Sequence, residues 1–177
     1  FFTTAGWAMF NMLLGGLASG SAVVLYDGCP TYPNDDRLWS MSERLGVSYF
    51  GVSPTYIHSL MNRGYSPKAH FSLDTIKTVA SGGSPVSAEV FRWFYDNIHQ
   101  DLHVVSMSGG TDVATAFVGG VSTLPVTAGR IQAPCLGVAA FGFSDGADVV
   151  VDEPAELVIT KAMPSMPIMF WNDSDST

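Results

Sequence analysis

The sequence predicts an α/β fold in which helices flank a mostly parallel β-sheet, followed by a small β-rich unit. Over the first two thirds of the chain, short apolar runs alternate with segments whose apolar residues recur every three or four positions. The first pattern is typical of buried strands and the second of amphipathic helices. Because short turns join them, we expect the strands to pair in parallel through crossover helices, with helices on both faces of the sheet.

The composition indicates a packed chain and argues against nucleic acid as a partner. Of the 177 residues, 47% are hydrophobic, which is enough to build a core. Sixteen acidic and eight basic residues give a net charge of −8, and no cluster of Lys or Arg could follow a phosphate backbone. Cys29 and Cys135 lack metal-ligand spacing, so we expect reduced thiols in a cytoplasmic protein.

The first 26 residues carry no charged side chain, and the run 7–26 is long enough to cross a bilayer. Glycines and serines at 15–21 nevertheless divide this run into a helix-like half and a β-branched half, 22–26, which ends at the turn pair Asp27-Gly28. A buried helix followed by a buried strand accounts for these glycines, so we expect no membrane partner. Without an initial Met or a basic leader, the chain is expected to be an excerpt from a longer polypeptide.

Local signals mark three amphipathic helices in the middle of the chain. Side chains that can accept hydrogen bonds from a first helical turn stand at the expected starts, and glycines follow two of the expected ends. The starts are Asn34 or Asp35, Ser53 before Pro54, and Ser87; the glycines are Gly46 and Gly64. Apolar strands are expected beside these helices at 47–52, within 73–80 and at 102–107.

After about Phe117 the helical periodicity ends, and short apolar runs separated by Gly and Pro predict β structure. We expect a small meander with strands at 138–143, 149–151 and 156–160. The predicted domains are therefore an α/β subdomain, residues 1–117, and a β-rich subdomain, residues 118–177.

Residues 106–112, Ser-Met-Ser-Gly-Gly-Thr-Asp, are the stretch around which we expect the chemistry to gather, because they close an apolar strand. Glycines there let a ligand approach the backbone, the Thr111 hydroxyl can bond a phosphate oxygen, and Asp112 can hold a hard cation such as Mg²⁺. A plain turn with an exposed acid is the alternative that this stretch alone leaves open, since short motifs also match by chance.

A second glycine-containing loop, 81–85, also follows the carboxyl end of a predicted strand. Ligands of open α/β sheets bind beyond the carboxyl ends of the strands, so both loops should lie at one edge of the sheet. Together they indicate a nucleotide or acyl site. The four histidines are far apart and show no metal-ligand spacing, so we expect them to be solvated or locally hydrogen-bonded.

Several segments together carry a resemblance that runs nearly from end to end: 3–7, 17–20, 24–28, 81–85, 106–112, 165–167 and 170–173. In these segments the chain resembles the adenylate-forming acyl-CoA ligase superfamily, and within it the branch that activates acetoacetate. The most specific part is Ser-Gly-Gly-Thr-Asp at 108–112, where the superfamily usually has aromatic-Gly-x-Thr-Glu. The fold would then be part of the large amino-terminal domain of these enzymes.

The resemblance implies an enzyme that uses ATP and Mg²⁺ to convert acetoacetate to an acyl-adenylate and then passes the acyl group to coenzyme A. It also implies that the remainder of the polypeptide is a partner, because the family's phosphate loop lies before Phe1 and its lid with the catalytic Lys lies beyond Thr177. The chain alone is therefore expected to be inactive. A ligase for another short oxo or branched acid, and a non-catalytic binding module, are the alternatives.

The resemblance also implies roles for single residues. Thr111, at the α-phosphate, and Asp112, at the Mg²⁺ ion, are the expected catalytic residues. The expected nucleotide contacts are Gly83, Ser84, Pro85, Ser106, Met107, Ser108, Gly109, Gly110 and Thr111. The expected acyl pocket is Trp7, Gly82 and Gly109, with both glycines leaving free volume where acetate-activating relatives carry bulkier side chains.

Overall fold

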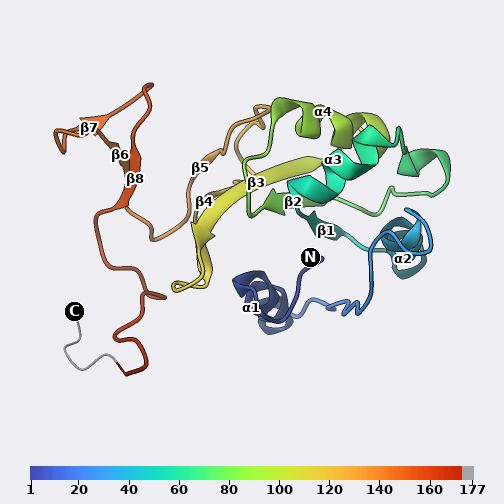
Figure 1. The fold of residues 1–177 in the computed structure, drawn as a ribbon, viewed down its shortest axis with the longest axis horizontal. Coiled ribbons are helices and arrows are strands. Elements are labelled where there is room, and N and C mark those ends of the chain that lie inside the picture. Colours follow the sequence, from blue (N-terminus) through green and yellow to red (C-terminus); the bar gives the residue numbers. More distant parts are fainter. Residues whose placement is uncertain (173–177) are drawn as a thin grey trace.

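A computed structural model describes residues 1–172, over which the chain forms two β-sheets (Figure 1). The first sheet has the strand order β1-β2-β3-β4-β5, with bounds Tyr49–Val52, Thr78–Gly82, His103–Gly110, Thr115–Gly119 and Ala133–Pro134. The second has the order β7-β6-β8, where β6 is Ala140–Phe143, β7 is Val149–Val150 and β8 is Glu156–Ile159. The helices are α1 (Ala8–Gly15), α2 (Arg37–Leu45), α3 (Pro54–Asn62) and α4 (Ala88–Asn97), with 3-10 turns η1 (Gly16–Ser19) and η2 (Pro67–Ala69).

The first sheet confirms the α/β class but is mixed rather than mostly parallel. β1, β2 and β3 are parallel neighbours, with Gly51 opposite Ala80 and Ala80 opposite Val105. β4 and β5 are antiparallel additions. The reason is that β3 runs past the predicted strand end and a short turn, in which the Ala114 N–H donates to the Thr111 carbonyl, returns the chain beside it. No crossover helix is needed there, so the pairing changes direction.

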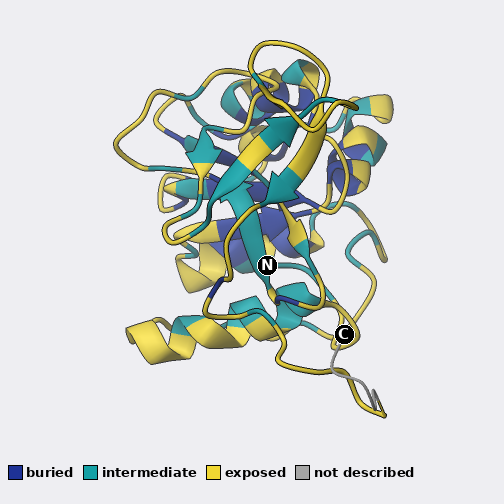
Figure 2. Cartoon of the chain, turned by 90° about the vertical axis from the view of Figure 1, so that its left-hand side faces the viewer, coloured by how far each residue is buried: buried dark blue, intermediate teal, exposed yellow. Residues whose placement is uncertain are grey.

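Trp39 of α2 joins three other elements of the core. Its ring stacks on Phe50 of β1 at a centroid distance of 4.6 Å, and its centroid lies 6.4 Å from that of Tyr56 in α3 and 6.1 Å from that of Trp93 in α4. Trp39 is fully buried. The buried residues gather in the first sheet and its covering helices, as Figure 2 shows, and α3 and α4 lie together on one side of that sheet (Figure 1).

The predicted helix signals are confirmed at most ends. The Ser53 hydroxyl accepts a hydrogen bond from the Tyr56 N–H at 3.3 Å, and the Ser87 hydroxyl accepts one from the Val90 N–H at 3.4 Å. Gly46 ends α2 in the left-handed conformation, with φ of +61°. Each signal acts within one helical turn, so no distant contact is needed to produce it.

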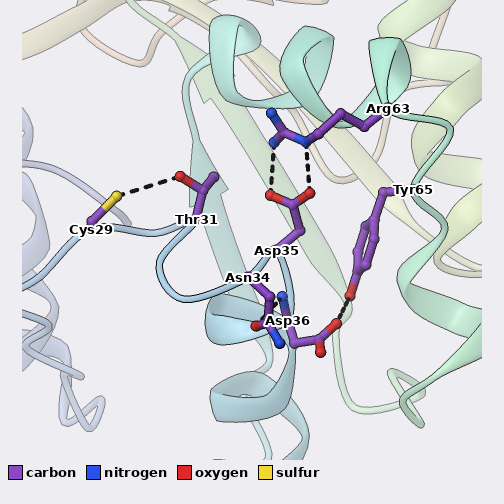
Figure 3. Close-up of polar contacts among 7 residues, drawn as sticks. All are labelled: Cys29, Thr31, Asn34, Asp35, Asp36, Arg63 and Tyr65. Carbon is purple, nitrogen blue, oxygen red and sulfur yellow. Dashed lines mark hydrogen bonds and ion pairs between the residues drawn. The ribbon is translucent and has the colours of Figure 1, made fainter.

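The predicted cap of α2 is wrong, because the side chains that could have formed it bond other groups (Figure 3). Asp35 accepts two hydrogen bonds, each of 2.7 Å, from Arg63 just beyond α3. Asp36 is the residue before α2, but its carboxylate accepts the Tyr65 hydroxyl and makes no capping bond. Asn34 accepts only the Asp36 N–H, at 3.3 Å. Burial, together with the hydrogen bond to Asp36, raises the pKa of Tyr65, which therefore stays a donor.

The expected buried helix and strand at the start of the chain are also wrong. No residue of α1 is buried, and 22–26 forms no strand pairing within the described residues. The edge of β1 is instead met by residues 1 and 2: the Phe2 N–H donates to the Gly51 carbonyl at 2.7 Å, and the Phe1 ring covers Gly51. An extended segment becomes a strand only beside a partner. As for a membrane span, no helix in the described part is long and apolar enough to cross a bilayer.

The second sheet contains strands close to their predicted positions, but in a different order. β6 lies in the middle and pairs antiparallel with both neighbours, so that Gly142 stands opposite Val150 on one side and Leu157 on the other. A meander would have placed β7 in the middle. Because β7 has two residues and β8 has four, β6 gains the longer ladder by pairing with β8 as well.

Replacement of Ser87 by Ala should lower the free energy of unfolding by about 1 kcal/mol, because the Val90 N–H loses its acceptor. Urea denaturation followed by circular dichroism measures the change. Ser66→Ala is the matched control, since Ser66 precedes η2 without making a side-chain capping bond. Equal losses in the two variants would contradict the capping role of Ser87.

Candidate functional site

A cavity of about 460 Å³ lies between α1 and the first sheet. This volume falls within the range of roughly 300–1,000 Å³ that small-molecule sites have. The walls are the start of α1, the loop after β2, and the end of β3 with the facing part of β4. The lining residues are Trp7, Ala8, Met9, Met12, Gly83, Ser84, Pro85, Ser106, Met107, Ser108, Gly109, Gly110, Thr111, Thr115, Ala116 and Ile131.

Parallel pairing brings the two glycine-containing segments to this cavity. In the ladder between β2 and β3, Ser81 stands opposite Ser106 and Gly82 opposite Met107, so both strands end at one edge of the sheet. The prediction that the segments share an edge is therefore confirmed. The loop itself begins at Gly83, whose φ of +90° is open to glycine but strained for other residues. A Cβ there would lie 3.8 Å from the Trp7 ring, so Trp7 stands beside this loop in the cavity wall.

Most residues predicted for the site line the cavity, with two exceptions. Those that line it are Trp7, Gly83, Ser84, Pro85, Ser106, Met107, Ser108, Gly109, Gly110 and Thr111. Gly82 and Asp112 do not. Gly82 belongs to β2, and Asp112 lies in the exposed turn after β3.

Gly82 leaves no free volume toward the cavity. A Cβ added to it would lie 3.0 Å from Cγ of Met107 and 3.2 Å from the Met107 carbonyl oxygen. Gly82 thus makes room for the Met107 side chain of the neighbouring strand. Met107 itself is half-buried and lines the cavity, so a larger residue at 82 would push this part of the wall.

Gly109 makes room for β4. Residues 108–110, expected as a loop wall, are the last part of β3, and the pairing register shifts between Ser108 and Gly109. A Cβ on Gly109 would overlap the Thr115 carbonyl oxygen and lie 2.6 Å from the Ala116 Cα. Its missing side chain therefore faces the backbone of the partner strand, and only the backbone of Gly109 faces the cavity.

The cavity surface is uncharged. Of the side chains that line it in residues 1–172, five carry hydroxyl groups and none carries a charge. The hydroxyls belong to Ser84, Ser106, Ser108, Thr111 and Thr115. A wall of this kind suits a flat, neutral ring or an apolar chain with a few oriented polar atoms. Anionic parts of a ligand would have to lie elsewhere.

Asp112 is the carboxylate nearest in sequence to the cavity wall. It follows Thr111 in the turn and is exposed to solvent. The described residues contain no group of three or more His, Cys, Asp or Glu side chains that could hold a metal ion. Mg²⁺ does not require such a group, because it is often held by one or two carboxylates together with phosphate oxygens and water. The exposed carboxylate of Asp112 fits that mode of binding.

The cavity also contains residues that sequence reasoning did not predict. Ala8, Met9 and Met12 belong to α1, which was expected to be buried as a whole, so no face of it was predicted to line a site. Thr115 and Ala116 come from β4, and Ile131 precedes β5. The sequence held no signal for these three, because the pairing of β4 and β5 brings them to the cavity.

Comparison with protein families matches residues 2–166 to the family described as AMP-binding enzyme. Among curated proteins, the acetoacetyl-coenzyme A synthetase of Rhizobium meliloti (strain 1021) is 42% identical over 175 residues, which are 99% of this chain and 27% of that protein. The acetoacetyl-CoA synthetase of Gallus gallus is 38% identical over 177 residues, 100% of this chain and 26% of that protein. The chain thus spans about a quarter of the length of these relatives.

Among solved structures, the acetoacetyl-CoA synthetase from Streptomyces lividans has a TM-score of 0.92 at 44% identity, covering 99% of this chain and 28% of that chain. An anthranilate CoA ligase in complex with anthranoyl-AMP has a TM-score of 0.73 at 13% identity, covering 88% of this chain and 29% of that chain. The second likeness shows the fold alone.

Replacement of Gly109 by Ala should destabilise the protein by at least about 1–3 kcal/mol, since backbone atoms of β4 must move to admit the methyl group. Gly110→Ala is the matched control, because the nearest atoms to its Cβ are side-chain atoms of Phe117 and Val113, at 3.3 and 3.4 Å. Urea denaturation of both variants makes the comparison. If Gly109→Ala were as stable as Gly110→Ala, the close strand contact would not be the reason for the glycine.

Proposed function

The chain belongs to the AMP-binding enzyme family, and we propose that it forms part of the substrate site of a ligase that activates acetoacetate with ATP and transfers the acyl group to coenzyme A. Membership confirms the family expected from the sequence. The observation that carries the proposal is that two segments of the resemblance, 81–85 and 106–112, line one cavity through residues 83–85 and 106–111. Identities of 38–44% with acetoacetyl-CoA synthetases along the chain support the choice of acid.

In this proposal the nucleotide lies between the two segments. Gly83, Ser84 and Pro85 run along one side of the adenine, and the end of β3 forms the facing wall. The uncharged lining supports this arrangement, because adenine is flat and neutral. Thr111 would donate its hydroxyl hydrogen to an oxygen of the α-phosphate, at the mouth of the cavity where the strand gives way to the turn.

Asp112 is the residue that would hold Mg²⁺. Its carboxylate stands one residue beyond Thr111, in the exposed turn, so it would meet the ion outside the cavity wall. When bound, the ion neutralises charge on the phosphate oxygens. Thr111 and Asp112 would thus orient the α-phosphate for attack by a carboxylate oxygen of the acid, with pyrophosphate as the leaving group. The coenzyme A sulfur would then attack the acyl carbon and release AMP.

The acyl part of the substrate would lie against Trp7 and the apolar face of α1. Gly82 and Gly109 act on this pocket indirectly in our proposal. Gly82 allows Met107 to take its place in the wall, and Gly109 allows β4 to approach β3. The apolar lining suits an acid with a short hydrocarbon part.

The test of the function is acid-dependent exchange between ATP and pyrophosphate in the complete polypeptide. Acetoacetate should support exchange with a higher specificity constant than acetate or a short branched acid. A higher specificity constant for a branched acid would make that acid the substrate in place of acetoacetate, and the proposed reaction would be unchanged. Absence of exchange with every acid, in a folded polypeptide that still binds AMP, would favour a binding module.

Replacement of Asp112 by Ala should slow exchange by on the order of a hundredfold or more, because loss of a ligand to a positioned ion removes a few kcal/mol of transition-state stabilisation. Asp145→Ala is the matched control, since Asp145 is likewise an exposed acid in a turn, within the second sheet. Exchange should be measured at limiting Mg²⁺. An unchanged rate in Asp112→Ala would remove this residue from the mechanism.

A further inference from the structure

The side-chain amide of Gln132, the residue before β5, has hydrogen-bond partners in two other segments, the loop 121–125 and the start of β3. Its Oε1 accepts the Val121 N–H at 3.0 Å and lies 3.1 Å from Nε2 of His103. Its Nε2 faces the carbonyl oxygens of Val121, Leu124 and Pro125 at 3.1, 2.8 and 3.2 Å. One half-buried amide therefore fastens the loop 121–125 to β3.

The partners determine the orientation of this amide. The three carbonyl oxygens can only accept, so they require the NH₂ group, and the Val121 N–H requires the oxygen. Because Oε1 is an acceptor, His103 must donate from its Nε2. The contacts are thus mutually consistent, and each would be lost if the amide were replaced by an apolar group of similar size.

The segment held in this way leads into the wall of the cavity. Val126, just after the loop, packs against the buried core. Gly129 lies against α4, since a Cβ on it would be 3.3 Å from the Ala88 nitrogen. Ile131, directly before Gln132, lines the cavity. The chain therefore has fixed points on both sides of Ile131, and Gln132 is the nearer one.

We infer that Gln132 is a positioning residue that sets the place of Ile131 in the cavity wall and thereby the affinity for the acid substrate. This inference rests on the proposed function and adds Ile131 to Trp7 and α1 in the apolar wall that holds the acyl part. Gln132 itself does not line the cavity. Its effect should therefore reach the substrate only through Ile131, and it should concern the acid more than the nucleotide phosphates.

The experiment compares three variants of the complete polypeptide by acid-dependent exchange between ATP and pyrophosphate. Gln132→Met removes the hydrogen bonds at similar volume, Ile131→Ala shortens the wall directly, and the double variant combines them. Gln100→Met is the matched control, because Gln100 makes a single hydrogen bond, of 2.9 Å to the Tyr95 carbonyl, and does not line this cavity. KM for acetoacetate, KM for ATP and kcat are measured for each.

We expect Gln132→Met to raise KM for acetoacetate several-fold, on the order of the change caused by a misplaced methylene in a pocket, with little change in KM for ATP. The double variant should be no worse than Ile131→Ala, because both changes act at one point. Equal rises in the two KM values, additive effects, or a Gln132→Met enzyme like the Gln100→Met control would each overturn the inference.

Two further results distinguish failure of this inference from failure of the proposed function. If Gln132→Met does not fold, Ile131→Ala still decides the matter, since an unchanged KM for acetoacetate in that variant removes the point through which Gln132 acts. A wild-type polypeptide without acid-dependent exchange would instead refute the proposed function. In that case the affinity for acetoacetate in the presence of AMP, measured by calorimetry, replaces KM, and Gln132→Met must weaken it together with Ile131→Ala or the positioning role fails.

Discussion

The close approach of β3 and β4 at Gly109 is the constraint on which the candidate site depends. β4 can lie against β3 there because residue 109 has no side chain to separate the two backbones. The contact fixes the end of β3, and with it the turn that carries Thr111 and Asp112. As a result, 108–110 form a strand wall rather than a free loop, and a ligand can bind against them without the cost of ordering that segment.

The core supports the cavity wall that the loop after β2 forms. Trp39 packs on β1, α3 and α4 together, so the position of α4 follows from the best-buried part of the molecule. α4 begins directly after its cap Ser87, and the loop 83–85 connects that cap to β2. The loop is thus short and held at both ends. The walls formed by this loop and by the end of β3 are therefore set by packing that lies outside the cavity.

The features that could be predicted from the sequence are those that local interactions produce and those that follow from the parallel order of neighbouring strands. The caps at Ser53 and Ser87 and the left-handed Gly46 need only their own helical turn, and the shared edge of 81–85 and 106–112 needs only parallel pairing. The incorrect predictions concern segments whose structure depends on a pairing or packing partner elsewhere in the chain. Burial of α1 and pairing of 22–26 depend on what lies beside them, and the order of the second sheet depends on which strand offers β6 the longer ladder. Likewise, the sequence does not show that a side chain at position 109 would overlap the backbone of Thr115.

The uncharged lining of the cavity and the carboxylate of Asp112 after it can be explained together. Both proposed substrates are anions, but the wall in the described residues has no charge to pair with them, and an unpaired anion is strongly unfavourable against such a surface. In the proposed function only the adenine and the acyl chain would suit the interior, so the phosphates would extend toward Thr111 and the exposed turn. There they would meet the carboxylate of Asp112, which would repel them without a cation between the two groups. An uncharged cavity with the exposed carboxylate of Asp112 directly after its lining residue Thr111 is therefore consistent with a nucleotide that arrives together with its metal ion.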